Sequence, residues 1–224
     1  MTRSFRLPVA PTIIAVALAF ALLTAACSTA GGGSSPRPSA TKGADASPGT
    51  GSSACPTAQP DPLPAGEKRV VTIETAKGTI AITIEADLSP IAAGNFVALA
   101  GCGYYDGIVF HRVLPGFVIQ GGDPTGTGRG GPGYTIEDED VTVPYVRGTV
   151  AMARTPAPNS VGSQFFIVLD DSAAQSLAAP TTNNYQIIGS VTEGMEAVDA
   201  IAAAADAELP TSPIVMDRVT VGTP

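Results

Sequence analysis

Short apolar runs, separated by turns that contain glycine or proline, recur throughout the sequence after residue 67. Eight runs are rich in β-branched and aromatic residues: 70–74, 79–84, 108–113, 117–120, 148–153, 165–169, 186–191 and 214–221. Runs of this length, several with alternating polarity, are typical of strands in an antiparallel sheet. Because strands and helices do not alternate along the chain, the pattern does not favour a parallel α/β fold.

Two segments among these runs have helical features. In residues 89–100, Ser89 occupies the position of an N-cap and Pro90 that of the first helical residue. A second helix is expected from Glu193 onward. Together the strands and helices predict a mainly β domain, with a closed antiparallel β-barrel capped by two α-helices.

The first 26 residues predict a signal peptide. Arg3 and Arg6 supply the positive charge, and residues 13–23 form an unbroken apolar run. That run is shorter than the roughly 20 residues that a transmembrane helix needs. It ends in small residues before Cys27, a pattern that resembles the lipobox of bacterial lipoproteins.

The lipobox resemblance implies that Cys27 is lipidated and anchors the chain to the membrane, outside the cytoplasm. An ordinary secretory signal, which would release a secreted protein, and an uncleaved anchor are the alternatives. Residues 27–66 consist mainly of Gly, Ser, Pro, Ala and Thr. Since such a segment has few large apolar side chains with which to offset the entropy of ordering, we expect a flexible tether. The folded domain is then residues 67–224.

Charge and residue counts exclude several functions. The chain has 12 basic and 20 acidic residues and a net charge of −8, which argues against nucleic acid as a partner. It has one histidine, His111, and three cysteines, so the usual zinc ligand sets cannot be assembled. We therefore expect neither a metal nor another cofactor.

Two cysteines remain if Cys27 is lipidated. Cys55 and Cys102 would then lie in a compartment that permits disulfides, and we predict that they form one. The bond would fasten the end of the tether to the domain. The alternative is two independent thiols.

Two stretches of sequence resemble the signature of the cyclophilin family. In the first, residues 110–123 read FHRVLPGFVIQGGD. The second has two parts: residues 148–154 read GTVAMAR, and residues 159–167 read NSVGSQFFI. The resemblance extends from about residue 70 to residue 221. It implies an eight-stranded closed β-barrel with two capping helices and peptidyl-prolyl cis-trans isomerase activity.

The same resemblance implies how the site works. Rotation about an X-Pro amide has a barrier of about 18 to 20 kcal/mol, and a catalyst lowers it by binding the twisted state most tightly. Arg112 would donate to the prolyl nitrogen, Gln120 would anchor the substrate backbone, and Phe117, Val118 and Phe166 would form the proline pocket. The other implied substrate-binding positions are Ala153, Arg154, Gln164, Leu177 and Tyr185.

Each assignment has a structural alternative. Arg112 can be a solvated or salt-bridged strand residue, and the phenylalanines can be ordinary core residues. His111 adjoins Arg112 and would face the opposite side of a strand, so we interpret it as structural. Residues 126–131 match G-x-G-x-x-G outside a strand-turn-helix context and are expected to form a flexible surface loop. The acidic run 137–140 lacks the spacing of a calcium loop and is interpreted as a solvated turn.

The sequence therefore predicts a monomeric, lipid-anchored isomerase that acts on proline-containing segments of exported proteins. One alternative is a non-catalytic binder of proline peptides, or a holdase chaperone, on the same fold. Another is a structural role in envelope assembly.

Overall fold

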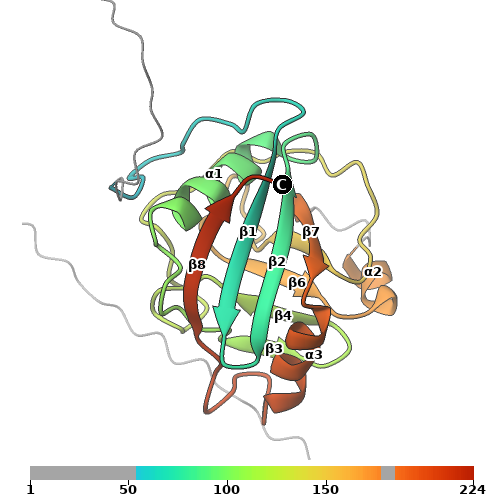
Figure 1. Cartoon of the computed structure of the whole chain (residues 1–224). Helices are drawn as coiled ribbons and strands as arrows, with labels where there is room; N and C mark the ends of the chain where they lie inside the picture. Colours follow the sequence, from blue (N-terminus) through green and yellow to red (C-terminus); the bar gives the residue numbers. More distant parts are fainter. Residues whose placement is uncertain (1–53, 178–184) are drawn as a thin grey trace, which may run out of the picture. The chain divides into compact units, whose positions relative to one another are not determined.

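The computed structural model describes residues 54–177 and 185–224, without the side chains of residues 174 and 175 (Figure 1). The predicted signal peptide and Cys27 lie outside these residues. Within the described ranges, every helix is too short or too polar to cross a lipid bilayer.

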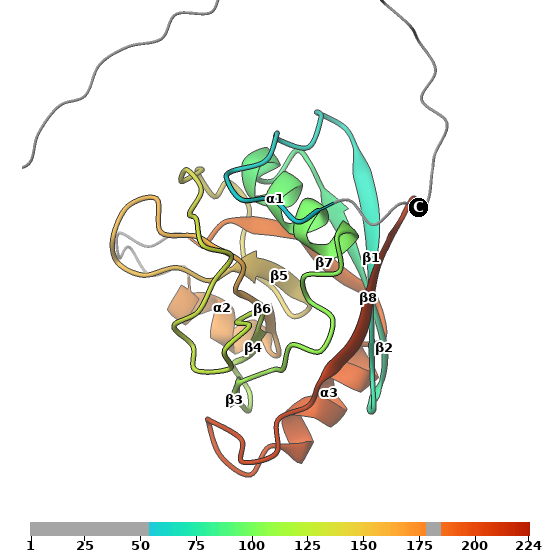
Figure 2. The same ribbon diagram turned by 90° about the vertical axis from the view of Figure 1, so that its left-hand side faces the viewer.

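The described residues form one eight-stranded antiparallel sheet. Its strands are β1 (Lys68–Thr75), β2 (Gly78–Glu85), β3 (Arg112–Leu114), β4 (Val118–Gly121), β5 (Thr149–Met152), β6 (Phe165–Val168), β7 (Ile187–Glu193) and β8 (Met216–Gly222). Neighbours in the sheet follow the order β3-β4-β6-β5-β7-β2-β1-β8. The sheet curves so that β1, β2 and β8 form one wall and β4, β5 and β6 the other (Figure 2).

The two edge strands, β3 and β8, are not paired with each other in this sheet. The segments that precede them are joined by the isolated bridge between Val109 and Val215. Backbone N–H groups of Phe110 and Met216 donate to carbonyl groups of the opposite segment, at 2.9 and 2.8 Å. The strands therefore form a curled half-barrel, and the predicted closed barrel is not confirmed.

Three helices occur in the described residues: α1 (Pro90–Gly101), α2 (Asp171–Leu177) and α3 (Met195–Ala204). Helices α1 and α3 lie at opposite ends of the curved sheet, as the sequence predicted for two capping helices (Figures 1 and 2). Helix α2 packs against β6 and was not predicted. The sequence gives little sign of this helix. The one capping feature at its start is the Asp170 carboxylate, which accepts from the Ser172 N–H at 2.8 Å.

The N-terminus of α1 is capped from a distant part of the chain. Ser89 occupies the N-cap position, but its side chain makes no cap hydrogen bond. Instead, the Glu139 carboxylate accepts from the N–H groups of Ile91 and Ala92, both at 2.9 Å. A carboxylate at this position satisfies unpaired donors and interacts favourably with the helix dipole. The interpretation of residues 137–140 as a solvated turn is therefore wrong for Glu139.

Cys55 and Cys102, the pair for which the sequence predicted a disulfide, are bonded, with their Cα atoms 5.2 Å apart. Cys102 lies at the C-terminal end of α1. The bond spans 47 residues of sequence. In the chain-entropy model, closing a loop of this length stabilises the folded state by about 4 kcal/mol.

Part of residues 56–66, which the composition assigned to the tether, packs against α1 around Leu63. Leu63 is 7% exposed and belongs to the main core. The backbone around Asp61 crosses α1 so closely that a Cβ at Gly94 would overlap it. The boundary predicted at residue 67 therefore falls inside the packed part of the chain. The composition of a segment indicates whether it can fold by itself. This segment has few apolar residues of its own, and its position is set by contacts with α1.

Strand β6, in the second wall of the sheet, is apolar on both faces. In β6, Phe165 and Ile167 belong to the main core, whereas Phe166 and Val168 belong to a second cluster on the other face. Val118 of β4 also belongs to that second cluster. Successive strand residues point to opposite faces, so a strand buried on both faces has no polar positions. The second cluster is where the candidate site lies.

Candidate active site

A cavity of about 200 Å³ opens over β4, β5 and β6. It is lined by Arg112, Phe117, Val118, Gln120, Ala153, Arg154, Phe166, Leu177 and Tyr185. These are nine of the ten substrate-site residues that the sequence singled out. The tenth, Gln164, lines an adjoining cavity. Residues far apart in the sequence are thus brought together as the resemblance implied.

Most of the side chains that line this cavity, here called the proline pocket, are apolar. Val118, Phe166 and Leu177 are 2%, 4% and 7% exposed. The rings of Phe166 and Tyr185 meet edge to face, with centroids 5.3 Å apart and planes at 88°. Edge-to-face contact fixes both rings. These buried side chains form an apolar surface suited to a small apolar ring such as pyrrolidine.

Tyr145 holds the Tyr185 wall in place, a role that the sequence analysis missed. Its hydroxyl donates to the Tyr185 carbonyl at 2.8 Å and accepts from the Tyr185 N–H at 2.9 Å. Burial raises the pKa of Tyr145 to about 12, so the hydroxyl remains protonated at neutral pH. No local motif marks Tyr145, because its partner lies 40 residues along the chain.

Arg112 supplies the polar edge of the proline pocket. It lies directly opposite Gln120 in the β3–β4 pairing, so both side chains emerge on the same face. Its Nη1 donates to Gln120 Oε1 at 3.4 Å, and its Nε donates to Glu208 Oε1 at 2.8 Å. The side chain is 33% exposed. Arg112 is therefore salt-bridged, as the structural alternative held, and also lines the pocket.

Two glutamines continue this polar chain across the site. Gln120 Nε2 donates to Gln164 Oε1, and Gln164 Nε2 donates to the Gly130 carbonyl, both at 2.9 Å. Each amide uses one end as acceptor and the other as donor, so its orientation is fixed. Gln164 thus orients neighbouring backbone while it lines the site.

The adjoining cavity, of about 410 Å³, shares Gln120, Ala153 and Arg154 with the proline pocket. Its other side is the glycine-rich segment 128–131. This segment is ordered around the buried Asp123 carboxylate, which accepts from the N–H groups of Thr125, Thr127 and Arg129 at 2.7 to 3.0 Å. The segment lies on the surface, as predicted, and these hydrogen bonds hold its backbone around one carboxylate.

The charge of Asp123 is stabilised by this loop. Burial alone would raise its pKa, but hydrogen bonds from the loop backbone and the Thr125 hydroxyl outweigh burial and hold the pKa well below its ordinary value. A Cβ at Gly130 would overlap the carboxylate, so the loop requires glycine there. One buried anion thus sets the shape of the adjoining cavity.

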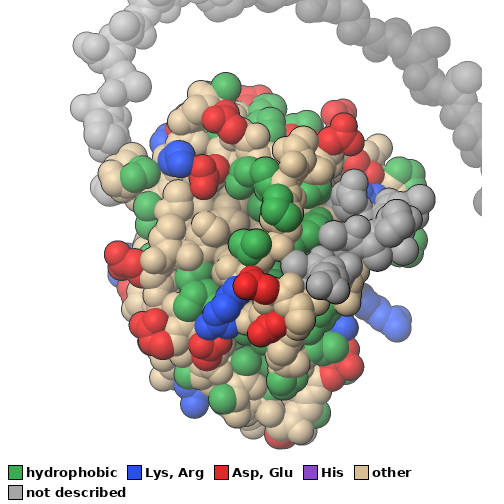
Figure 3. All heavy atoms as spheres, turned by 90° about the vertical axis from the view of Figure 1, so that its right-hand side faces the viewer, with side chains coloured by type: hydrophobic (Ala, Val, Ile, Leu, Met, Phe, Trp, Pro, Cys, Tyr) green, Lys and Arg blue, Asp and Glu red, His purple; other side chains and the backbone are tan. Residues whose placement is uncertain are grey.

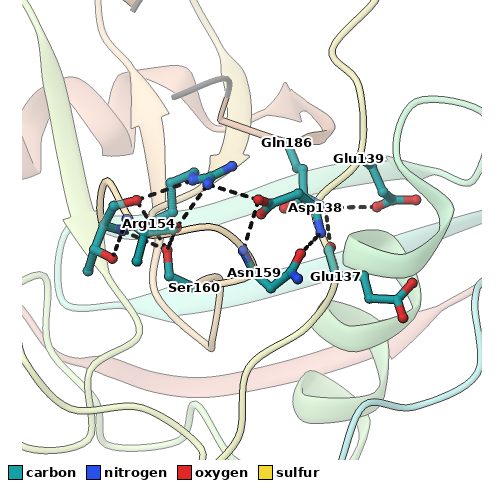
Figure 4. A network of polar contacts seen from close by, with 9 residues as sticks. Glu137, Asp138, Glu139, Arg154, Asn159, Ser160 and Gln186 are labelled. Atoms are coloured by element: carbon teal, nitrogen blue, oxygen red, sulfur yellow. Dashed lines mark hydrogen bonds and ion pairs between the residues drawn. The ribbon is translucent and has the colours of Figure 1, made fainter. Parts of the chain in front are cut away.

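The Arg154 guanidinium forms an ion pair with Asp138. Its Nη2 donates to Asp138 Oδ2 at 2.9 Å and to the Ala157 carbonyl at 3.0 Å (Figure 4). The side chain is 6% exposed. Asp138 also accepts from the Asn159 N–H at 2.8 Å, so the ion pair fastens the loop after β5. Arg154 also lines both cavities.

His111 directly precedes β3 and lines neither cavity. It is 5% exposed, and burial lowers its pKa. A neutral, buried imidazole beside the Gly128 loop is consistent with the structural role predicted for it.

On the face seen in Figure 3, acidic side chains are scattered among hydrophobic ones, and basic side chains are few.

Comparison with known proteins identifies this arrangement. The family model described as "Cyclophilin type peptidyl-prolyl cis-trans isomerase/CLD" matches residues 70–221. A probable peptidyl-prolyl cis-trans isomerase A of Mycobacterium leprae is 37% identical over 180 residues, covering 69% of this chain and 93% of that protein. A putative bifunctional phosphatase/peptidyl-prolyl cis-trans isomerase of Streptococcus pyogenes is 51% identical over 102 residues, and this chain spans only 22% of its length.

Comparison with solved structures points to the same family. A cyclophilin-type peptidyl-prolyl cis-trans isomerase of Cryptosporidium parvum is similar with a TM-score of 0.62 and 33% identity, covering 70% of this chain and 99% of that one. The same protein in the presence of the dipeptide Ala-Pro gives a TM-score of 0.60. The fold and site define a peptidyl-prolyl cis-trans isomerase. The chain belongs to the cyclophilin-type family of these enzymes.

Proposed function

We propose that Arg112 accelerates X-Pro rotation by donating to the prolyl nitrogen while the apolar pocket grips the ring. As the amide twists, the nitrogen loses resonance with the carbonyl and regains a lone pair. A guanidinium fixed at the edge of the pocket stabilises that state more than the planar one. The observation that carries the proposal is the position of Arg112 among Phe117, Val118 and Phe166.

Gln120, Ala153 and Arg154 line the same cavity. The Gln120 side chain and the backbone of the other two residues are proposed to hold the substrate main chain. No bond of the substrate breaks, so the mechanism needs neither a nucleophile nor a general base. The residues do three things: they grip the ring, anchor the flanking backbone and present one positive donor.

Exchange NMR on an Ala-Pro peptide tests this mechanism. Arg112→Ala should lower the cis-trans exchange rate at catalytic enzyme concentration by about a hundredfold, since a charged donor to the transition state is lost. Circular dichroism should be unchanged, because the side chain is partly exposed. Retained exchange in the variant would refute the role of Arg112. Peptide binding without exchange in the wild-type chain would favour the non-catalytic binder.

We also propose that the enzyme acts outside the cytoplasm as a monomer held at the membrane through a lipid on Cys27. The support is the sequence of residues 1–27, which places small residues before a cysteine after a short apolar run. Multiple acyl chains give stable anchoring. Unfolded segments of exported proteins that contain proline would then be its substrates.

Mass spectrometry of the chain isolated from membranes tests the anchor. The expected N-terminal peptide begins at Cys27 and carries acyl chains, and Cys27→Ala should move the protein out of the membrane fraction. An unmodified N-terminus elsewhere, in a secreted protein, would contradict the proposal. Sedimentation of the detergent-solubilised chain tests the monomer.

A further inference from the structure

The Arg112 guanidinium makes a second contact, away from the proline pocket. Its Nε donates to Glu208 Oε1 at 2.8 Å, although the two residues lie 96 positions apart. Nη1 donates to Gln120, which lines the proline pocket, whereas Glu208 does not. The guanidinium is planar and has five N–H donors, so fixing Nε and one Nη fixes the direction of the rest. The remaining Nη protons are then left for a substrate.

Glu208 is itself held in register with Arg112. Its carbonyl accepts from the N–H of Val113, the residue after Arg112, at 2.8 Å. The segment that carries it is closed by Asp206, which accepts from the Thr211 N–H at 3.0 Å. A backbone bond one residue away from the ion pair limits the freedom of both partners.

The ion pair between Arg112 and Glu208 contributes little to the free energy of folding. The two side chains are 33% and 56% exposed, and ion pairs at such positions contribute little to folding stability. Catalysis is more sensitive than stability, because a donor misplaced by about 1 Å can cost about a hundredfold in rate. A contact that adds little to stability can therefore still matter for the orientation of the reacting group.

We infer that Glu208 is a positioning residue for the isomerase reaction: it fixes the Nε edge of Arg112 and thereby aims the Nη edge at the prolyl nitrogen. The inference rests on the proposed role of Arg112. It extends the site to the segment between α3 and β8, which contributes no residue to the proline pocket.

Exchange NMR on the Ala-Pro peptide with the full-length chain tests the inference. Glu208→Gln should lower kcat/KM about tenfold, less than the hundredfold above, because Gln120 still holds one Nη. The loss should fall mainly on kcat, since the apolar grip on the ring is untouched. Glu208→Asp, which restores the charge, should recover part of the rate. Glu196→Gln removes one charge from an exposed position in α3 and should change nothing.

Two further readouts separate positioning from a structural role. The Nε–H resonance of Arg112 should shift in Glu208→Gln, while the free energy of unfolding in urea stays the same. In an Arg112→Lys background, which has no Nε donor, Glu208→Gln should cause no additional loss. Wild-type turnover in Glu208→Gln, or a loss explained by destabilisation with an unmoved Arg112 resonance, would overturn the inference. Full activity in Arg112→Ala would instead overturn the proposed mechanism.

Discussion

The two cavities of the active site are built by different means. The proline pocket is formed by buried side chains such as Val118 and Phe166, which pack as a second apolar cluster. The adjoining cavity is formed largely by glycine-rich backbone that hydrogen bonds arrange around Asp123. Side-chain packing shapes the pocket for one ring, whereas the shape of the backbone wall depends on hydrogen bonds to one buried carboxylate.

This contrast predicts the largest effect for truncation of the pocket. Phe166→Ala should lower the free energy of unfolding by about 3 kcal/mol, because it leaves a cavity among buried neighbours, and should remove most turnover. Urea unfolding and exchange NMR measure both quantities. Phe117→Ala is the matched control, because Phe117 lines the same pocket but is only partly buried. It should reduce turnover with a smaller loss of stability, and equal stability losses would contradict the contrast.

A smaller effect is expected from the backbone wall. Asp123→Asn should lower the free energy of unfolding by about 2 kcal/mol, since the hydrogen bonds to a charged acceptor are weakened. Turnover of a short Ala-Pro peptide should be largely retained, because the proline pocket is intact. Asp217→Asn, at an exposed position in β8, is the control and should leave stability unchanged.

The Asp123 contribution also depends on pH. Because its pKa is lower in the folded chain than the ordinary 3.8, the folded state binds the proton more weakly than the unfolded state. The stabilisation is complete at neutral pH and is lost progressively as the pH falls below about 4. The difference between wild type and Asp123→Asn should therefore narrow in acid. A difference that stays constant down to pH 2 would contradict this account.

The smallest effect should come from Tyr145→Phe, which removes the two hydrogen bonds to the Tyr185 backbone. We expect a loss of about 1 kcal/mol in stability and a rise of a few-fold in KM, since one wall of the proline pocket is loosened. Tyr134→Phe is the control, because its hydroxyl donates to Asn95 and it lines the adjoining cavity. A KM effect as large in Tyr134→Phe would mean that the two cavities are not independent.

Most of the sheet and the pocket could be predicted from the sequence. The β-rich runs identified the strands, and the signature around Arg112 and Phe166 contains seven of the nine residues that line one cavity. The other two, Leu177 and Tyr185, came from the wider family resemblance. The predictions of strands and of motif residues were correct because strand periodicity and a family motif are both local in sequence. Helix α2 was missed because seven residues give little periodicity.

Contacts between distant residues could not be predicted in this way. Glu139 caps α1 from 48 residues away, and Glu208 reaches Arg112 across 96. Acidic side chains on the surface are common, and no pattern distinguishes one that has a partner. The packing of Leu63 was hidden for a similar reason, since a single apolar residue in a polar segment carries no periodicity.

The disulfide between Cys55 and Cys102 also determines how the domain would bear mechanical load. Tension applied to the chain before Cys55 passes through the sulfur atoms directly to the end of α1. Strands β1 and β2 and helix α1 lie between the two cysteines in sequence and are bypassed by that force. With the bond reduced, the same tension would peel residues 56–66 from α1 and then reach β1.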